Sequence, residues 1–494
     1  MRGDPPPSRL PSEVPDGVES RLDALLTAQR SIRDEYERQV AHLEGTIDAL
    51  KARQRWMERS RSWTLTRPLR VMTEAARLLT TRRGSLVDIG KGAVERLPRQ
   101  GLPRTSSWIR EQVRRLQFSP QHVARLDEIL RQYEGRPIVV THRGVDWNVP
   151  LFQRPQQLAR ALASAGFLFF FVTENRRFDA VDGFVEVEPG CFVTNQNELL
   201  LSADLRRIIY LCSTSFSATP ETLDEVSQRG DRLVYEYIDE IHEDLSGPIP
   251  ASLWARHRQA LADESVVCVA TADSLLAEVS LARRRNFGLV TNGVDAEHFV
   301  RRERAPHPLM LPVLARGRPI VGYYGALANW FDYELVRDVA RLLPEYEFVL
   351  IGPNYDQTGL QTTLHQEPNV TLLGAVPYGE LPSAAQSFDV AIIPFKLNAV
   401  TASTSPIKVF EYMALGLPMV TTDMPECRKY QSVQIGRGPA DFASRVRHAA
   451  TLRSNPEYLA LLARDAAQNT WAVKASQLEA LMTTAWGVRP PQGR

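Results

Sequence analysis

Cysteine is scarce in this chain of 494 residues, and long apolar runs are absent. The four cysteines lack the paired spacing of a disulfide framework or a zinc site. No stretch approaches the ~18–20 uninterrupted apolar residues that span a membrane. The best run, "GFLFFFV" at 166–172, suits a buried strand. The first residues are polar and rich in proline, without the apolar core of a signal peptide. We therefore expect a cytoplasmic protein.

Charge is nearly balanced overall but unevenly distributed, with a net charge of +1. Residues 61–120 contain 13 Lys and Arg against 4 Asp and Glu, an excess of +9, so the remainder of the chain carries −8. Apolar residues at helical spacing accompany the first of these basic residues. Such a segment can lie on anionic lipid, here the inner face of the plasma membrane. A solvated helical connector would have the same composition.

The N-terminal part of the chain predicts three segments. Residues 1–19 have the composition of a disordered tail. Apolar residues recur at heptad spacing within 20–60, which favours a short coiled coil and a possible homodimer, with a solvated single helix as the alternative. Residues 61–135 form the basic, helical linker region.

From residue 136 the sequence pattern changes to that of alternating strands and helices. Runs such as "PIVVTH", "RLVYEYID", "IVGYYG" and "EFVLIGPN" are apolar at nearly every residue. Strands of this kind are buried on both faces of a parallel sheet that helices cover. The alternation restarts after residue 301, so we expect an α/β fold of two Rossmann-like domains, 136–300 and 301–455, facing across a cleft. Helices at 456–487 would follow.

One segment of the second domain, "TSPIKVFEYMALGLPMVTTD" at 404–423, combines features of an anion site. Ser405 can cap a helix that begins at Pro406. Lys408 adds positive charge to the first turn, and Glu411 lies three residues later on the same face. A cation for a diphosphate and a carboxylate for two hydroxyl groups together suit a nucleotide. A surface ion pair is the alternative.

This segment resembles the donor-binding segment of family 4 (group 1) glycosyltransferases, which have the GT-B fold. Matches in the expected order include "WNVPLFQRPQQLARALASAG", "VTNGVDAEHF", "VGYYGALANWFD" and "VTLLGAVPYGELP", and they extend over roughly residues 136–487. "SRSWTLTRPLR" after a coiled coil looks like segments attached to bacterial O-antigen and capsule transferases. The last helices resemble the GT-B tail that crosses back over the first domain, although a terminal packing hairpin would look the same.

The resemblance implies roles for further residues. Glu411 would hold the ribose and Lys408 the diphosphate, Gly325 would let the backbone approach the phosphates, and the loop around Val376 and Tyr378 would contact the base. Asn398 would also lie at the donor site. Two departures from the family pattern stand out. Ser403 occupies the place of the usual first glutamate, and "ALANWFD" lacks the usual Arg and Lys. Transfer with retention of configuration is therefore expected but left open.

In the first domain, Asp239 follows a predicted strand and is the candidate catalytic group, with a capping role as the alternative. Gln153 and Arg154 open a helix and are candidates for contact with the acceptor, with intramolecular pairing as the alternative. No metal requirement, no cofactor and no nucleic-acid partner are predicted. The donor would be a nucleotide-diphosphate sugar.

Three functions remain open from the sequence. The favoured one is transfer of a sugar to a glycan or polyprenyl-linked acceptor in bacterial surface polysaccharide synthesis. A sugar-nucleotide epimerase with the same fold would need a full acid/base set near the sugar, which is not apparent. A non-catalytic coiled-coil assembly subunit would explain Ser403, but not the retained Lys408 and Glu411.

Overall fold

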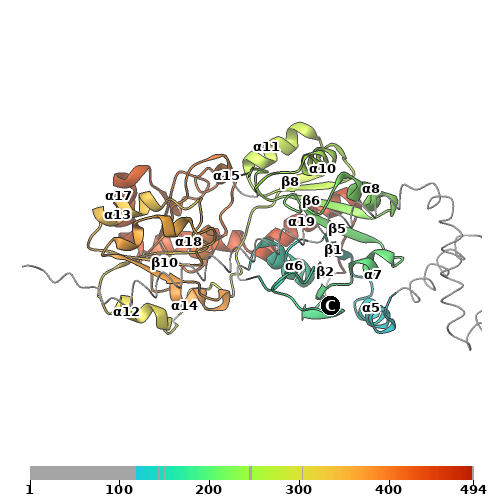
Figure 1. The fold of residues 1–494 in the computed structure, drawn as a ribbon, viewed down its shortest axis with the longest axis horizontal. Coiled ribbons are helices and arrows are strands. Elements are labelled where there is room, and N and C mark those ends of the chain that lie inside the picture. Colours follow the sequence, from blue (N-terminus) through green and yellow to red (C-terminus); the bar gives the residue numbers. More distant parts are fainter. Residues whose placement is uncertain (1–117, 143, 150–151, 244–246, 303, 492–494) are drawn as a thin grey trace, which may run out of the picture. The chain divides into compact units, whose positions relative to one another are not determined.

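The computed structural model describes residues 118–491, except for residues 143, 150–151, 244–246 and 303. All of them belong to the unit formed by residues 106–494. The predicted tail, the predicted coiled coil and nearly all of the basic linker region lie outside the described residues. The fold described below is that of the two sheet domains and the helices around them (Figure 1).

The first domain is built on a sheet of eight strands in the order β3-β4-β2-β1-β5-β6-β7-β8. The strands are β1 (Ile138–Thr141), β2 (Leu168–Val172), β3 (Phe184–Glu188), β4 (Cys191–Thr194), β5 (Arg207–Cys212), β6 (Arg232–Tyr237), β7 (Val267–Ala270) and β8 (Phe287–Leu289). All neighbours pair in parallel except β3 and β4, which are antiparallel. The sequence did not predict this antiparallel edge.

Both faces of the first sheet are covered, because successive residues of a strand contribute to opposite cores. Phe170 belongs to the core under one face, and Phe169 and Phe171 belong to the core under the other. The first face packs against α5 (Pro120–Gln132), α7 (Asn197–Ser202), α8 (Pro220–Gln228), α10 (Ala251–Ala262) and α11 (Asp273–Ala282). The second face packs against α6 (Arg154–Ser164) and α19 (Trp471–Trp486).

The second domain has six parallel strands in the order β11-β10-β9-β12-β13-β14. They are β9 (Ile320–Tyr324), β10 (Glu347–Ile351), β11 (Val370–Gly374), β12 (Val390–Ile393), β13 (Met419–Thr421) and β14 (Val433–Ile435). The surrounding helices are α12 (Leu311–Leu314), α13 (Tyr333–Leu342), α14 (Leu381–Ala385), α15 (Ala399–Ala402), α16 (Ile407–Ala414), α17 (Gly438–Leu452) and α18 (Pro456–Gln468). One continuous core joins the sheet to its helices. The predicted fold class, two Rossmann-like domains, is confirmed.

The last two helices divide between the two domains. In α18, Leu462 and Ala466 pack into the core of the second domain. In α19, Leu478 and Met482 pack into the core of the first domain, against the strands and α6. The last two helices therefore pack on different domains, whereas a terminal hairpin would keep both on one domain.

Candidate donor site

Two neighbouring strands of the second domain end in glycines with unusual backbone angles. Gly325 follows β9 with φ of 138°, and Gly352 follows β10 with φ of 153°. The Gly325 N–H donates to the carbonyl of Ile351 at 2.8 Å. A Cβ on Gly352 would lie 1.8 Å from the Gly325 carbonyl oxygen. Only glycine allows this approach, so two strand ends present bare backbone at the edge where α/β sheets bind ligands.

Lys408, in the first turn of α16, lies directly over the first of these glycines. A Cβ on Gly325 would be 2.1 Å from Lys408 Cε and 2.7 Å from its Nζ. The ammonium also lies 5.7 Å from the ring centroid of Tyr323 and 5.9 Å from that of Phe395. Burial lowers the pKa of Lys408 from its ordinary value, and nearby Glu411 opposes this shift. No carboxylate of the described residues lies within 4.0 Å of this ammonium, so the surface ion pair considered above is not formed.

Glu411 is buried, with a relative exposure of 6%. Its Oε2 accepts a hydrogen bond from the hydroxyl of Tyr324 at 2.9 Å. Burial raises its pKa to about 7, while Lys408 and the Tyr324 hydrogen bond act in the opposite direction. Glu411 therefore does not lie on the surface, as the alternative of a surface ion pair would require. The apolar side of α16 packs so deeply into the domain core that its fifth residue is enclosed with it.

The start of α16 also differs from the prediction. The helix begins at Ile407 with Pro406 as the N-cap, and no side chain caps it. Ser405 is buried, and its carbonyl accepts from Asn292 Nδ2 at 2.6 Å. The predicted cap at Ser405 is wrong, because the helix starts one residue later than the sequence pattern indicated. Ser403 donates its hydroxyl to the carbonyls of the preceding turn of α15.

Tyr378, which begins a short 3-10 helix, η4 (Tyr378–Glu380), is held from both sides. Its ring stacks on His298 with 4.7 Å between ring centroids. Its hydroxyl accepts from Gln157 Nε2 at 2.7 Å. Val376 is half-buried and packs against the domain core. Asn398 caps α15, where its side chain accepts from the Thr401 N–H at 2.9 Å. The side chain of Asn398 is thus engaged in its own helix.

Asp239 lies two residues beyond the end of β6, with its side chain half-buried. Burial raises its pKa to about 7, and the nearby Arg154 guanidinium opposes the shift. Among the described residues, none donates a hydrogen bond to this carboxylate. Asp239 is therefore not the helix cap that the sequence allowed as an alternative.

Arg154 does not face a cleft, because its side chain is fully enclosed. Its Nε donates to Glu236 Oε1 at 2.8 Å and its Nη1 to the carbonyl of Thr291 at 2.8 Å. The prediction that Arg154 contacts the acceptor is therefore wrong. A buried guanidinium requires a counter-charge, and Arg154 has one in Glu236 of its own domain. Gln153 is exposed, and its N–H donates to Gln156 Oε1 at 3.4 Å.

Sequence reasoning missed three contributors to this region. Gly352 and Tyr324 each lie at the end of a buried strand, and this position in the sequence could have identified them as candidate site residues. Lys474 of α19 is buried, and its Nζ donates to Thr291 Oγ1 and Asn469 Oδ1 at 2.7 and 2.8 Å. Burial, followed by repulsion from Arg154, lowers its pKa to about 8. No sequence signal marks Lys474.

Two negative findings hold for the part of the chain that the structure describes. No cluster of three or more His, Cys, Asp or Glu residues could hold a metal ion. None of the described helices has the length and apolar character required to cross a bilayer.

Comparison with known proteins agrees with this geometry. Residues 318–451 match the family model described as Glycosyl transferases group 1. A curated relative from Bacillus subtilis (strain 168), the putative teichuronic acid biosynthesis glycosyltransferase TuaH, is 28% identical over 188 residues. The match covers 36% of this chain and 46% of the relative, so the chain spans about half of that protein's length.

Solved structures share the fold at low sequence identity. Sucrose-phosphate synthase from Thermosynechococcus elongatus gives a TM-score of 0.54 at 14% identity, over 71% of this chain and 99% of that one. HepE of Anabaena, in complex with UDP, gives 0.53 at 14% identity, over 70% of this chain and 100% of that one. Residues 318–451 thus form a domain that matches the group 1 glycosyltransferase model, and the two sheet domains share the GT-B fold of these solved structures.

Proposed function

We propose that this protein transfers a sugar from a nucleotide-diphosphate sugar to a glycan or polyprenyl-linked acceptor during synthesis of bacterial surface polysaccharide. The family match at 318–451 supports the class of reaction. The role in teichuronic acid biosynthesis for which TuaH is named supports the class of product. The UDP bound to HepE, which shares the fold, is consistent with a nucleotide sugar as donor.

The observation that carries the proposal is the Lys408 ammonium above the bare backbone of Gly325 and Gly352. A diphosphate needs close approach to backbone amides and a cation, and both are present where two parallel strands end. Burial lowers the pKa of Lys408, so the ammonium gains more from an anionic partner than a solvated lysine would. We assign the donor diphosphate to this position.

Glu411 would hold the ribose. Oε2 accepts from Tyr324, whereas no described residue donates to Oε1. A carboxylate with one oxygen fixed and the other available can accept hydrogen bonds from vicinal hydroxyl groups. Tyr324 thus positions Glu411. Tyr378 and Val376 would approach the base. Asn398 would contribute indirectly, because its side chain caps α15.

The chemistry of transfer is a finer part of the proposal. We expect retention of configuration without a metal ion, with Asp239 as the candidate catalytic group because its half-buried carboxylate has no hydrogen-bond donor among the described residues. Ser403 cannot supply the carboxylate that the family usually has at that position. NMR of the first product formed from a defined donor would distinguish retention from inversion.

The test of the donor site is Glu411→Gln in the full chain, with Glu457→Gln on the exposed start of α18 as the matched control. A thermal-shift panel of UDP-, GDP-, dTDP- and CMP-linked sugars first identifies the donor. Glu411→Gln should then lose donor binding and transfer without a decrease in the melting temperature of the unliganded protein. Unchanged donor affinity would contradict the ribose assignment. Donor binding without any transfer by the wild type would favour the non-catalytic subunit.

Membrane attachment through residues 61–120 and dimerisation through the coiled coil belong to the same proposal, although both lie almost entirely outside the described residues. The +9 excess of residues 61–120 supports attachment at the inner face of the plasma membrane. In the full chain, replacing Arg67, Arg70 and Arg77 by Gln should reduce co-sedimentation with phosphatidylglycerol vesicles. Equal sedimentation of both proteins would contradict it.

A further inference from the structure

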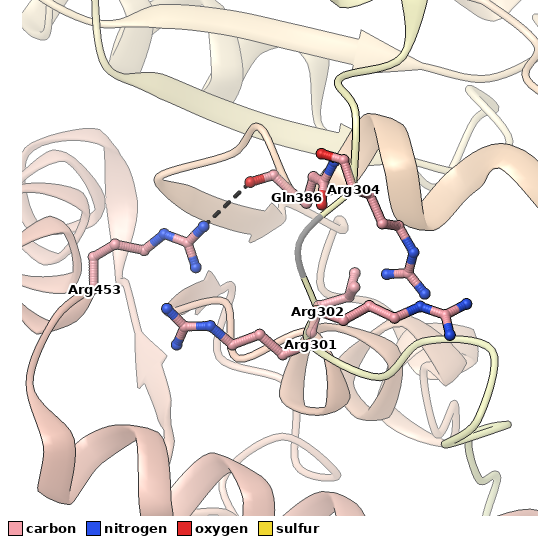
Figure 2. Close-up of a pocket in the computed structure, with 6 residues that line it drawn as sticks. Arg301, Arg302, Arg304, Gln386 and Arg453 are labelled. Carbon is pink, nitrogen blue, oxygen red and sulfur yellow. Dashed lines mark hydrogen bonds between the residues drawn. The ribbon is translucent and has the colours of Figure 1, made fainter.

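Apart from the proposed donor site, the second domain has a pocket of about 400 Å³ that is lined by four arginines (Figure 2). Arg301, Arg302 and Arg304 precede the second sheet, and Arg453 ends α17. The remaining lining residues are Gln386 and Leu415, which end α14 and α16. In Figure 2 the guanidinium of Arg301 faces that of Arg453, and those of Arg302 and Arg304 lie together.

These guanidinium groups have no counter-charge within ion-pair distance among the described residues. Arg453 donates only to the carbonyls of Gly416 and Gln386, at 3.1 and 3.2 Å. Arg304 donates to two carbonyls of its own segment. Arg301 and Arg302 have no hydrogen bond to any described residue. Like charges that lie together repel one another, and a single carboxylate from Glu303, which lies outside the described residues, would still leave an excess of positive charge among these four arginines.

Burial and this repulsion lower the pKa values of two of these arginines. Burial and then the charge of Arg301 lower the pKa of Arg453 from its ordinary value. Burial and then the charge of Arg302 lower the pKa of Arg304. Asp389 is the one carboxylate that acts on Arg453 in the other direction, and its Oδ2 already accepts the N–H of Ile320 at 2.7 Å. The arginines elsewhere in this domain are better matched, as Arg316 is by Glu347.

A second pocket of the same domain shows the contrast. It has a volume of about 580 Å³ and lies beyond β12, β13 and β14, lined by Asp332, Glu334, Asp338, Asp423 and Arg437, among others. Its single arginine is paired with Asp423 at 2.8 Å. The arginine of this pocket thus has a carboxylate partner, unlike the four arginines of the first pocket.

We propose that the pocket of Arg301, Arg302, Arg304 and Arg453 binds a small, multiply charged oxyanion of the phosphate class. The planar guanidinium fork pairs with two oxygens of a phosphate at once, and four forks suit more than one phosphate group. A volume of about 400 Å³ is sufficient for such a ligand. This site is distinct from the proposed donor site, because it lies at the C-terminal end of α16, whereas Lys408 lies at the N-terminal end.

The backbone at that end of α16 is shaped to admit the arginines. Gly416 has φ of 63°, and a Cβ there would lie 2.8 Å from Arg301 Cδ. Its carbonyl accepts from Arg453. A glycine thus allows two guanidinium groups to reach the same helix end, where the helix dipole also favours cations. An anion bound by these arginines would contact the element that carries Lys408 and Glu411.

The test is a titration of the full chain with inorganic tripolyphosphate by isothermal calorimetry at low salt. Lys408→Ala is included in every protein, so that the proposed donor diphosphate site does not contribute. We expect one saturable site, weakened about tenfold or more by Arg302→Gln and unchanged by the matched control Arg437→Gln. Arg302 is exposed, so its variant should melt as the parent does. Absence of saturable binding, or equal binding by both variants, would overturn the proposal.

A second arm separates a free ligand from a lipid headgroup. Co-sedimentation with phosphatidic acid vesicles, in the presence and absence of tripolyphosphate, compares the parent with Arg302→Gln. Sedimentation that tripolyphosphate displaces and Arg302→Gln weakens assigns the pocket to a lipid phosphate. Calorimetric binding without such sedimentation assigns it to a soluble phosphate. Sedimentation that is indifferent to both, combined with no calorimetric site, would overturn the proposal.

Discussion

The two sheet domains have the same architecture but use buried charge differently. In the first domain, Arg154 is neutralised by Glu236, which also accepts from the hydroxyl of Tyr210. In the second domain, Lys408 has no such partner, and Glu411 is held by a neutral tyrosine. A buried charge that its own domain satisfies stabilises the fold, whereas one that is left incomplete is available to a ligand.

The ends of the strands repeat the difference. In the first sheet, β1 ends in Thr141, whose hydroxyl accepts the N–H of Val172 at 2.8 Å. In the second sheet, the corresponding strand β9 ends just before Gly325, and the neighbouring β10 ends just before Gly352. Side chains close the first edge, and bare backbone opens the second. This difference supports the proposed donor site in the second domain, and the following changes test it.

The largest effect should come from breaking the buried pair of the first domain. Arg154→Met leaves Glu236 buried without its cation, which should cost about 3–5 kcal/mol of stability. Urea unfolding measures the loss. The double variant Arg154→Met/Glu236→Gln should recover part of it, because no uncompensated charge remains. A loss below about 1 kcal/mol would show that the pair is dispensable.

Removal of the Lys408 ammonium should act on ligand binding instead of stability. Lys408→Ala should weaken a diphosphate-containing nucleotide by about 1.5–3 kcal/mol, the range for hydrogen bonds to charged groups. A nucleoside should bind equally to variant and wild type. Calorimetry with UDP and uridine, or with the base that the donor panel selects, measures both. Equal losses for the two ligands would mean that Lys408 is structural.

Gly325→Ala should close the bare strand end. The new Cβ would displace the Lys408 side chain, and the positive φ adds a strain of about 1–3 kcal/mol. We expect weaker donor binding and a lower melting temperature. The control is Gly374→Ala, which has φ of 74° but nothing within 4 Å of its Cβ. If both variants bind the donor equally well, backbone access at Gly325 is not needed.

The smallest effect should be a pH dependence that resides in Glu411. Its pKa is about 7, so ionisation between pH 6 and 8 should raise donor affinity by about tenfold at most. Glu411→Gln should abolish this dependence.

The free energy of unfolding should change with pH in the opposite direction. The folded state retains a proton that the unfolded state has lost, so the contribution of Glu411 to stability falls as pH rises from about 4.5 to about 7.

The stability part of this prediction needs its own control, because Asp239 also has a pKa of about 7 and contributes in the same direction. The difference between the unfolding curves of wild type and Glu411→Gln isolates Glu411. A donor affinity that is flat with pH in the wild type would show that Glu411 is ionised throughout, and would contradict the buried environment described here.

The sequence by itself determined the two-sheet architecture, because strands buried on both faces must be apolar throughout and therefore stand out. It also placed Lys408 and Glu411 on one helix, since local spacing alone sets which residues share a turn. The antiparallel edge was missed, because β3 mixes apolar residues with two glutamates, is fully buried only at Phe184, and lacks the continuous apolar run.

Only the tertiary structure decided what each charge meets. Arg154 and Glu236 are 82 residues apart in the sequence, and no local pattern joins them. The depth of Glu411 depends on how α16 packs into the core. The arginine pocket brings Arg301, Arg302 and Arg304 together with Arg453, which follows α17. Helix and strand periodicity are properties of neighbouring residues, whereas burial and pairing depend on contacts between distant segments, which the fold alone creates.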